Sequence, residues 1–118
     1  MEVHGRVVSC LFCRIVDGEI PSDVCAVREN AIAIRDIAPA APSHLLVIPK
    51  RHFENLTTFM QGSDAASVAQ LFGFAAELGS ALDGGYRLVV NTGIRGGQTV
   101  GHLHLHVLGG RTLEWPPG

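Results

Sequence analysis

The sequence predicts an α+β domain in which one long helix packs on an antiparallel sheet. Residues 102–107 alternate histidine with leucine or valine, which is the two-residue period of a strand. Residues 44–49 form a nearly continuous apolar run, typical of a strand that is buried on both faces. Residues 64–82 repeat apolar side chains at helical spacing, so this helix should lie against the sheet.

The remaining elements are shorter, and turn residues separate them. Ser63 or Asp64 should cap the long helix, and Asp83-Gly84-Gly85 should end it. Two apolar runs split by Glu29-Asn30 indicate a hairpin. The other expected elements are a short helix or turn at 10–16, a proline-ordered loop at 36–43, a short helix from Asn55, a strand at 86–91 and a glycine-rich loop at 92–98.

Length and composition narrow the class of protein. The 118 residues fit one domain, which we place at 10–118 behind a flexible N-terminal arm of residues 1–9. A net charge of -2 argues against a nucleic-acid partner, and no apolar run is long enough to span a membrane. Three cysteines without a secretion signal predict reduced thiols and a cytoplasmic location.

The histidine row carries the strongest functional indication. On a strand, His102, His104 and His106 share one face, opposite Leu103 and its alternate neighbours. Such a row suits a metal site, a proton relay or a nucleophilic histidine, whereas the plain alternative is an edge strand with solvated histidines. The preceding Gly96-Gly97-Gln98-Thr99 could offer backbone and side-chain donors to a phosphate, although alone it reads as a tight turn.

Cys10 and Cys13 have the spacing of half a zinc site. The candidate partners are His52 and one histidine of the row, and the alternative is that both cysteines are core residues. Three further residues have plain structural interpretations when each is taken alone. These are His44 as a satisfied polar group at a strand end, and Asp36 and Asn91 as turn formers.

The stretch His102-Leu103-His104-Leu105-His106-Val107-Leu108 resembles the histidine-triad (HIT) motif, in which histidines alternate with apolar residues. The resemblance is to the Hint branch and covers all but about the first nine residues. The other segments that resemble this branch are Phe12 to Pro21, Asp36-Ile37-Ala38-Pro39, residues 44–50, Gly85-Tyr86-Arg87, Val89-Val90-Asn91 and the tail Trp115-Pro116-Pro117-Gly118.

The resemblance implies a homodimer in which two five-stranded antiparallel sheets join into one. It also implies binding of AMP- or GMP-like purine nucleotides and cleavage of the P–N bond of nucleoside phosphoramidates, with no cofactor required for the chemistry. His104 would attack phosphorus and form a nucleotidyl-histidine. Three alternatives stay open: a nucleotide-binding or interaction scaffold with incidental turnover, a Fhit-like dinucleoside polyphosphate hydrolase, and a catalytic metal held by all three histidines.

Roles for the other site residues follow from the same resemblance. His102 would orient the nucleophile, while His44 and a cationic His106 would lie around the phosphate and the leaving group. The expected nucleotide contacts are Asn91, Gly97, Gln98 and Thr99 for the phosphate and ribose, Asp36 for the ribose hydroxyls, Phe12, Ile15, Ile34 and Ile37 for the base, and Trp115 from the partner subunit.

In bacterial-type members of the family, a structural zinc is held at positions that match Cys10, Cys13, His52 and His102. All four ligand types are present in this chain. Gly101 and Ile34 stand where the Hint branch often has an aromatic residue. These two departures predict a more open base site and leave the purine preference undecided.

Overall fold

The computed structural model describes residues 2–3 and 5–118. The helices are α1 (Leu11–Val16), α2 (Leu56–Gly62) and α3 (Ala65–Ser80). The strands are β1 (Glu2–Val3), β2 (Arg6–Val7), β3 (Val24–Val27), β4 (Ala31–Arg35), β5 (Ser43–Pro49), β6 (Tyr86–Val89) and β7 (Leu105–Gly109). Within the described residues, no helix combines the length and the hydropathy needed to cross a membrane.

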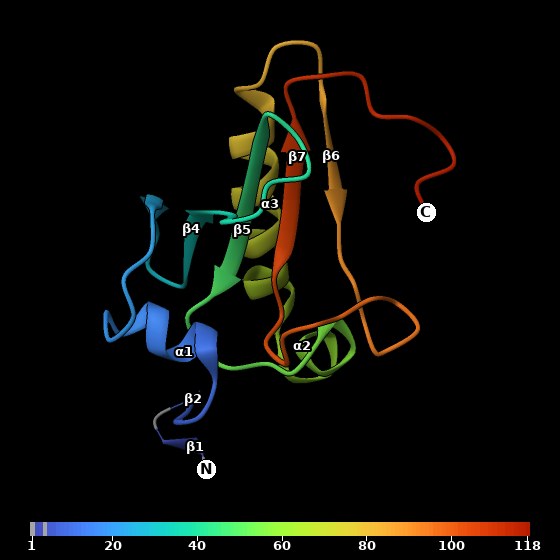
Figure 1. Cartoon of the computed structure of the whole chain (residues 1–118). Coiled ribbons are helices and arrows are strands. Elements are labelled where there is room, and N and C mark those ends of the chain that lie inside the picture. The colour runs from blue at the N-terminus through green and yellow to red at the C-terminus, as the bar shows by residue number, and fades with distance from the viewer. Residues whose placement is uncertain (1, 4) are drawn as a thin grey trace.

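A five-stranded antiparallel sheet forms the centre of the molecule, with the strand order β3-β4-β5-β7-β6 (Figure 1). This confirms the predicted α+β class and the hairpin of β3 and β4. β5 is the middle strand, as its continuous apolar run predicted. Leu46 of β5 pairs with Ile34 on one side and with His106 on the other, so these three side chains share one face of the sheet.

The two faces of the sheet bury different clusters. Figure 1 shows α3 behind β5 and β7, and this face holds the larger core, which includes Val47, Leu71, Phe74 and the row Leu103, Leu105 and Val107. Burial of that row confirms the predicted alternation. On the other face, Phe12 of α1 packs on Ile32, Ile34, Leu46 and Ile48. The histidines therefore lie on the face that α1 covers.

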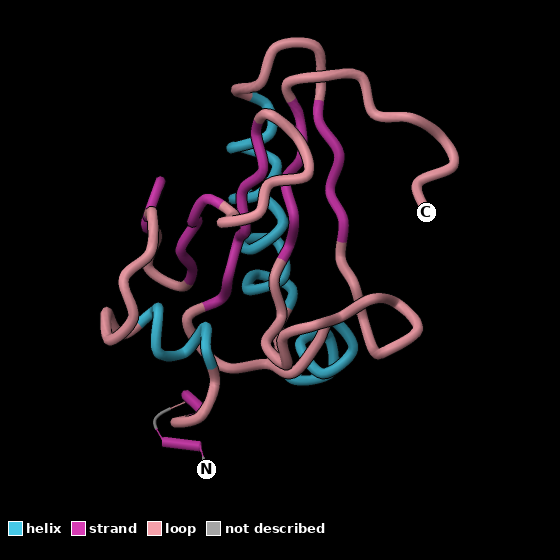
Figure 2. The backbone as a smooth tube through the Cα atoms, in the orientation of Figure 1, coloured by secondary structure: helices cyan, strands magenta, loops and turns pink. Residues whose placement is uncertain are grey.

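The regular strand begins at Leu105, so the prediction of a strand from residue 102 was wrong about its start. Figure 2 shows the stretch before β7 as loop. Pairing of β7 with β5 ends at Leu105 opposite Val47, and the N–H of Leu103 instead donates to the carbonyl of Phe53 at 2.7 Å. The histidine and leucine side chains still alternate between the two faces over this stretch. Its backbone, however, bonds to the loop that contains Phe53 and not to a strand.

The helix starts are set by side-chain caps. Asp64, rather than Ser63, caps α3, because its Oδ1 accepts from the N–H of Ser67 at 2.8 Å. Asn55 caps α2 in a reciprocal capping box with Thr58. Cys10 stands at the cap of α1, where its Sγ accepts from the N–H of Cys13 at 3.4 Å. The start of α1 therefore brings the two cysteines together.

Part of the predicted N-terminal arm contacts the domain. Arg6 forms an ion pair with Asp17, and the N–H of Val7 donates to Sγ of Cys13 at 3.3 Å. Met1 and His4 lie outside the described residues, and the domain boundary at residue 10 stays a prediction.

A close approach between α3 and β6 yields a stability test. A Cβ on Gly79 would lie 2.3 Å from Cδ2 of Tyr86, whereas a Cβ on Gly73 of the same helix would meet nothing within 4 Å. We expect Gly79→Ala to lower the free energy of unfolding by about 1–3 kcal/mol through overpacking. Gly73→Ala should raise it by roughly 0.5–1 kcal/mol through helix propensity. Urea denaturation measures both, and equal effects would refute the close packing.

Candidate functional site

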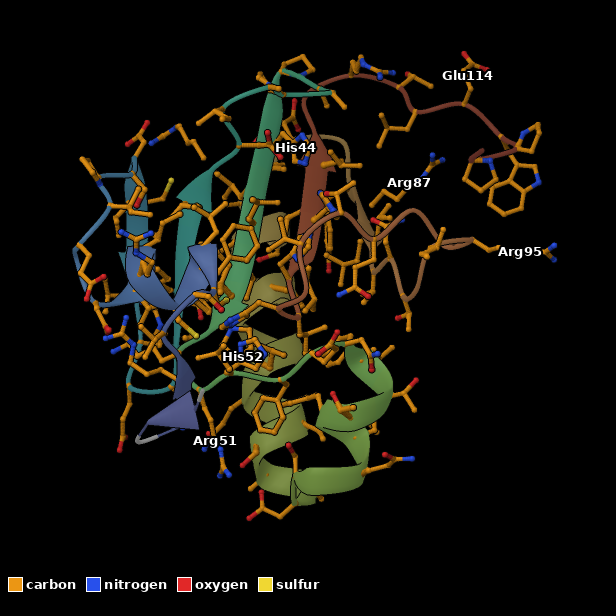
Figure 3. All side chains as sticks on the ribbon, turned by 60° about the horizontal axis from the view of Figure 1, so that its bottom comes forward. His44, Arg51, His52, Arg87, Arg95 and Glu114 are labelled. Atoms are coloured by element: carbon orange, nitrogen blue, oxygen red, sulfur yellow. The ribbon has the colours of Figure 1, made fainter. Side chains whose placement is uncertain are left out.

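The imidazoles gather on the face of the sheet that α1 covers. His44 comes from β5, His106 from β7, and His104 precedes β7; His44 and His104 are only 8% and 7% exposed. The Phe12 ring of α1 stands edge-on to His104, with the ring centroids 5.0 Å apart. Figure 3 shows His44 beside β7 near one end of β5, and His52 lies beyond the other end. The site therefore runs along the sheet between these two residues.

One hydrogen bond assigns the tautomer of His104. Its Nδ1 lies 2.8 Å from the carbonyl oxygen of His102. A carbonyl only accepts, so Nδ1 must carry a proton and donate. In the neutral ring, Nε2 then holds the lone pair. The buried His104 thus presents one nucleophilic nitrogen.

A second chain of hydrogen bonds orients His106. The N–H of Ala40 donates to Nδ1 of His44 at 3.0 Å, so the proton of the neutral His44 ring lies on Nε2. That Nε2 is 2.9 Å from Nδ1 of His106, to which it donates. His106 is left with its own proton on Nε2. His104 and His106 therefore present opposite functions, a lone pair and an N–H donor.

Asp36 lies beside this pair. Its Oδ2 is 3.4 Å from Nε2 of His44, and its Oδ1 accepts from the N–H of Ala38 at 2.8 Å. Asp36, His44 and His106 offer donor atoms within 4.8 Å of one another, a spacing that could also suit a metal. A metal on Nε2 of His44 would require the proton on Nδ1, where the Ala40 N–H already donates. The hydrogen bonds favour a polar relay over a metal site.

Burial keeps His106 neutral in the free protein. Desolvation is the main cause that lowers its pKa from 6.5 to about 4; His104 and His44 lower it further, and Asp36 opposes them. The expectation of a cationic His106 was therefore wrong for this state. Its contribution to binding a phosphate is a neutral N–H donor.

The second cluster brings the four predicted metal ligands together. Nδ1 of His102 lies 3.2 Å from Sγ of Cys10 and 3.5 Å from Sγ of Cys13, and Sγ of Cys13 is 3.5 Å from Nδ1 of His52. Bonds of the usual zinc–sulfur and zinc–nitrogen lengths place tetrahedral ligand atoms about 3.3–3.8 Å apart. These three distances are close to that spacing, and the ligand atoms of Cys10, Cys13, His52 and His102 all lie within 4.8 Å of one another.

The protonation of this cluster also fits a metal. Nε2 of His102 donates to the carbonyl of Pro49 at 2.8 Å, which turns the Nδ1 lone pair toward the cysteines. Burial lowers the pKa of His102 to about 4, so the ring is neutral at pH 7. Burial raises the pKa of Cys13 to about 11, so metal binding would release a thiol proton.

The three histidines of the row do not converge on one ion. Nδ1 of His102 faces the cysteines, Nδ1 of His104 faces a carbonyl, and Nδ1 of His106 faces His44. This separation disfavours the triple-histidine metal site that the sequence left open.

The predicted base slot is brought together only in part. Phe12, Ile15 and Ile34 belong to one apolar cluster beside His104. Ile37 is fully exposed, and Trp115 is 80% exposed on the C-terminal tail, which extends beyond β6 in Figure 1. Nucleotide contacts by these residues stay predictions.

The glycine-rich loop uses several of its expected donors internally. Gln98 accepts from the N–H of Gly93 and donates to the carbonyls of Glu54 and Val100. The N–H of Gly97 donates to the carbonyl of Ile94 at 3.1 Å. The side chain of Asn91 donates to the carbonyl of Gly96 at 2.7 Å, and Thr99 is exposed. The structure places Gln98 and Asn91 as loop-bracing residues, and their predicted nucleotide contacts stay predictions.

Sequence reasoning missed the backbone groups that set the tautomers. These are the N–H of Ala40 and the carbonyls of Pro49 and His102. Every residue has such groups, so no sequence pattern distinguishes them.

Comparison with known proteins agrees with this geometry. The HIT domain family model matches residues 17–113. A HIT-like protein of Synechococcus elongatus is 47% identical over 111 residues, covering 92% of this chain and 96% of its own. A HIT family hydrolase from Legionella pneumophila is 46% identical with a TM-score of 0.86, covering 93% of this chain and 100% of its own. A zinc-bound histidine triad family protein from Mycobacterium smegmatis is 34% identical with a TM-score of 0.76, covering 91% of this chain and 81% of its own.

The lowered pKa of His106 predicts acid sensitivity. Its pKa is about 4 folded and about 6.5 unfolded, so the unfolded chain binds more protons between these values. The stability from the neutral ring is full above pH 6.5 and is lost as pH falls toward 4. Between pH 7 and pH 5, we expect the wild type to lose on the order of 1 kcal/mol more unfolding free energy than His106→Gln. Urea titrations at equal metal content test this, and parallel losses would contradict it.

Proposed function

Because this chain belongs to the HIT domain family, we propose that it is a nucleotide-binding hydrolase that cleaves the P–N bond of purine nucleoside phosphoramidates. The chain shares the fold of the HIT family hydrolase from Legionella. The observation that best supports the proposed activity is the bond from Nδ1 of His104 to the carbonyl of His102. This bond occupies Nδ1, so in the neutral form of this buried imidazole the lone pair lies on Nε2 and can act as a nucleophile.

The first step forms a covalent intermediate. The Nε2 lone pair of His104 attacks the α-phosphorus, a P–N bond to the imidazole forms, and the P–N bond to the amine breaks. The amine nitrogen takes a proton from solvent water as it leaves. The Nε2–H of His106 would donate to a phosphoryl oxygen on which charge collects, which is the stabilisation that phosphoryl transfer mainly needs.

The second step releases the product. A water oxygen attacks phosphorus, the bond from phosphorus to His104 breaks, and the nucleoside monophosphate leaves. The water proton goes to the amine released earlier or to solvent. The apolar cluster of Phe12, Ile15 and Ile34 would take the base, and Asp36 beside His44 would take the ribose hydroxyls.

We propose that Cys10, Cys13, His52 and His102 hold a structural zinc. Their spacing supports this, and the Mycobacterium relative is zinc-bound. Zinc would tie α1 to the loop before β7 and keep the His102 carbonyl aimed at His104. The chemistry at phosphorus needs no metal.

We propose a homodimer in which the partner's tail completes the site. β6 is an edge strand of the described sheet, and Arg87 on it donates to the carbonyls of Leu113 and Glu114. This contact directs the tail outward, where the exposed Trp115 would reach a second copy.

Removal of the nucleophile tests the mechanism. His104→Ala should slow amine release from a fluorogenic adenosine phosphoramidate by more than about a thousandfold, because the proposed nucleophile is removed. Circular dichroism and calorimetry with AMP should show a folded variant that still binds nucleotide. Retained turnover in that variant would sink the mechanism.

The same assay separates the rival functions. Wild-type protein that binds AMP but releases no amine would point to a nucleotide-binding scaffold. Turnover of a diadenosine polyphosphate in place of the phosphoramidate would point to the Fhit-like activity.

The metal proposal has its own matched pair of cysteine variants. Protein purified with zinc should carry one zinc ion per chain by elemental analysis. Cys13→Ser should lose most of it, because a buried thiolate ligand is removed. Cys25→Ser, at an exposed cysteine outside the cluster, should retain it. Equal zinc content in the two variants would refute this ligand set.

A further inference from the structure

Ala40 is held on both sides within the loop between β4 and β5. Its N–H donates to Nδ1 of His44 at 3.0 Å, and its carbonyl accepts from Nη2 of Arg111 at 3.0 Å. Arg111 follows β7, 71 residues further along the chain. An exposed arginine is therefore bonded directly to the residue that sets the tautomer of His44.

The segment that carries Arg111 packs closely on this loop. Gly110 has a φ of +90°, and a Cβ there would lie 2.9 Å from Cβ of Pro42. Nη1 of Arg111 donates to the carbonyl of Thr112 at 2.9 Å, which orients the guanidinium. Among the described residues, no carboxylate pairs with Arg111. The Arg111 guanidinium therefore donates to the backbone carbonyls of Ala40 and Thr112, and these bonds fix the path of the loop.

The Arg111 contact affects the reacting face of the site through the imidazoles of His44 and His106. With the Ala40 N–H in place, His44 holds its proton on Nε2 and donates to Nδ1 of His106, so His106 presents Nε2–H. If the backbone at Ala40 shifts and its N–H moves away, His44 can place its proton on Nδ1. His106 would then donate from Nδ1 and turn a lone pair toward the phosphoryl oxygens, which repels the charge it should stabilise.

We propose that Arg111 is a positioning residue, which acts through the backbone of Ala40 and through His44 to keep His106 in the tautomer that donates from Nε2. This inference rests on the proposed function for its kinetic part only. The tautomers themselves can be observed without any substrate.

Long-range proton–nitrogen NMR spectra of the histidine rings give the decisive readout. In the wild type, we expect His44 and His106 to carry their protons on Nε2. In Arg111→Met, which keeps the length but removes the donors, we expect a mixture of tautomers at both rings. Arg111→Lys retains one donor for the Ala40 carbonyl and should restore most of the wild-type pattern.

Kinetics with the phosphoramidate gives the second readout. Arg111→Met should lower kcat roughly tenfold with little change in KM, because the lost donor acts on the charge that develops at phosphorus. Arg111→Lys should recover most of kcat. The matched control is Arg28→Met, which removes another exposed arginine, one that pairs with Glu77 away from this loop, and should match the wild type.

The outcomes separate the two proposals. Wild-type tautomers together with wild-type kcat in a folded Arg111→Met would overturn the inference. A tautomer change of equal size in Arg28→Met would also overturn it, because the effect would then be unspecific. If the wild type releases no amine, the proposed function fails, and the NMR comparison still decides whether Arg111 positions His106.

Discussion

The hydrogen bond between the ring of His104 and the carbonyl of His102 is the constraint on which the site depends. It exists only because the loop before β7 stays extended while its neighbours are anchored. Leu103 is buried and its N–H bonds to Phe53, and the His102 ring reaches the Pro49 carbonyl. The position of His104, the proposed nucleophile, is thus set by the backbone, which core packing holds on one side and the Cys/His cluster holds on the other.

Burial keeps two histidines of the row neutral. It lowers the pKa of His102 and of His106 to about 4, so these two rings are uncharged at pH 7. Each ring then needs one donor and one acceptor partner, and the fold supplies both from different elements. In the proposed function, the three identical residues of the row would therefore take three different roles: metal ligand, nucleophile and N–H donor.

Helix α1 couples the two halves of the site. It begins at the cysteine pair, and its Phe12 lies edge-on to both His102 and His104 while it packs on the sheet. The N-terminal segment adds an ion pair from Arg6 to Asp17. Order in the proposed metal site and in the proposed base slot should therefore depend on the same six-residue helix.

The sequence by itself determined the α+β class, the buried central strand, the capped long helix and the alternation that buries Leu103, Leu105 and Val107. It also named the four residues, Cys10, Cys13, His52 and His102, that the structure brings within 4.8 Å of one another, because residue type and spacing carry that information. Only the tertiary structure decided that β7 starts at Leu105, that Gln98 braces its own loop, that Ile37 is exposed and that His106 is neutral. Those properties depend on which backbone and side-chain groups contact one another over long sequence separations, as Ala40, His44 and His106 do. Local periodicity carries no information about such contacts.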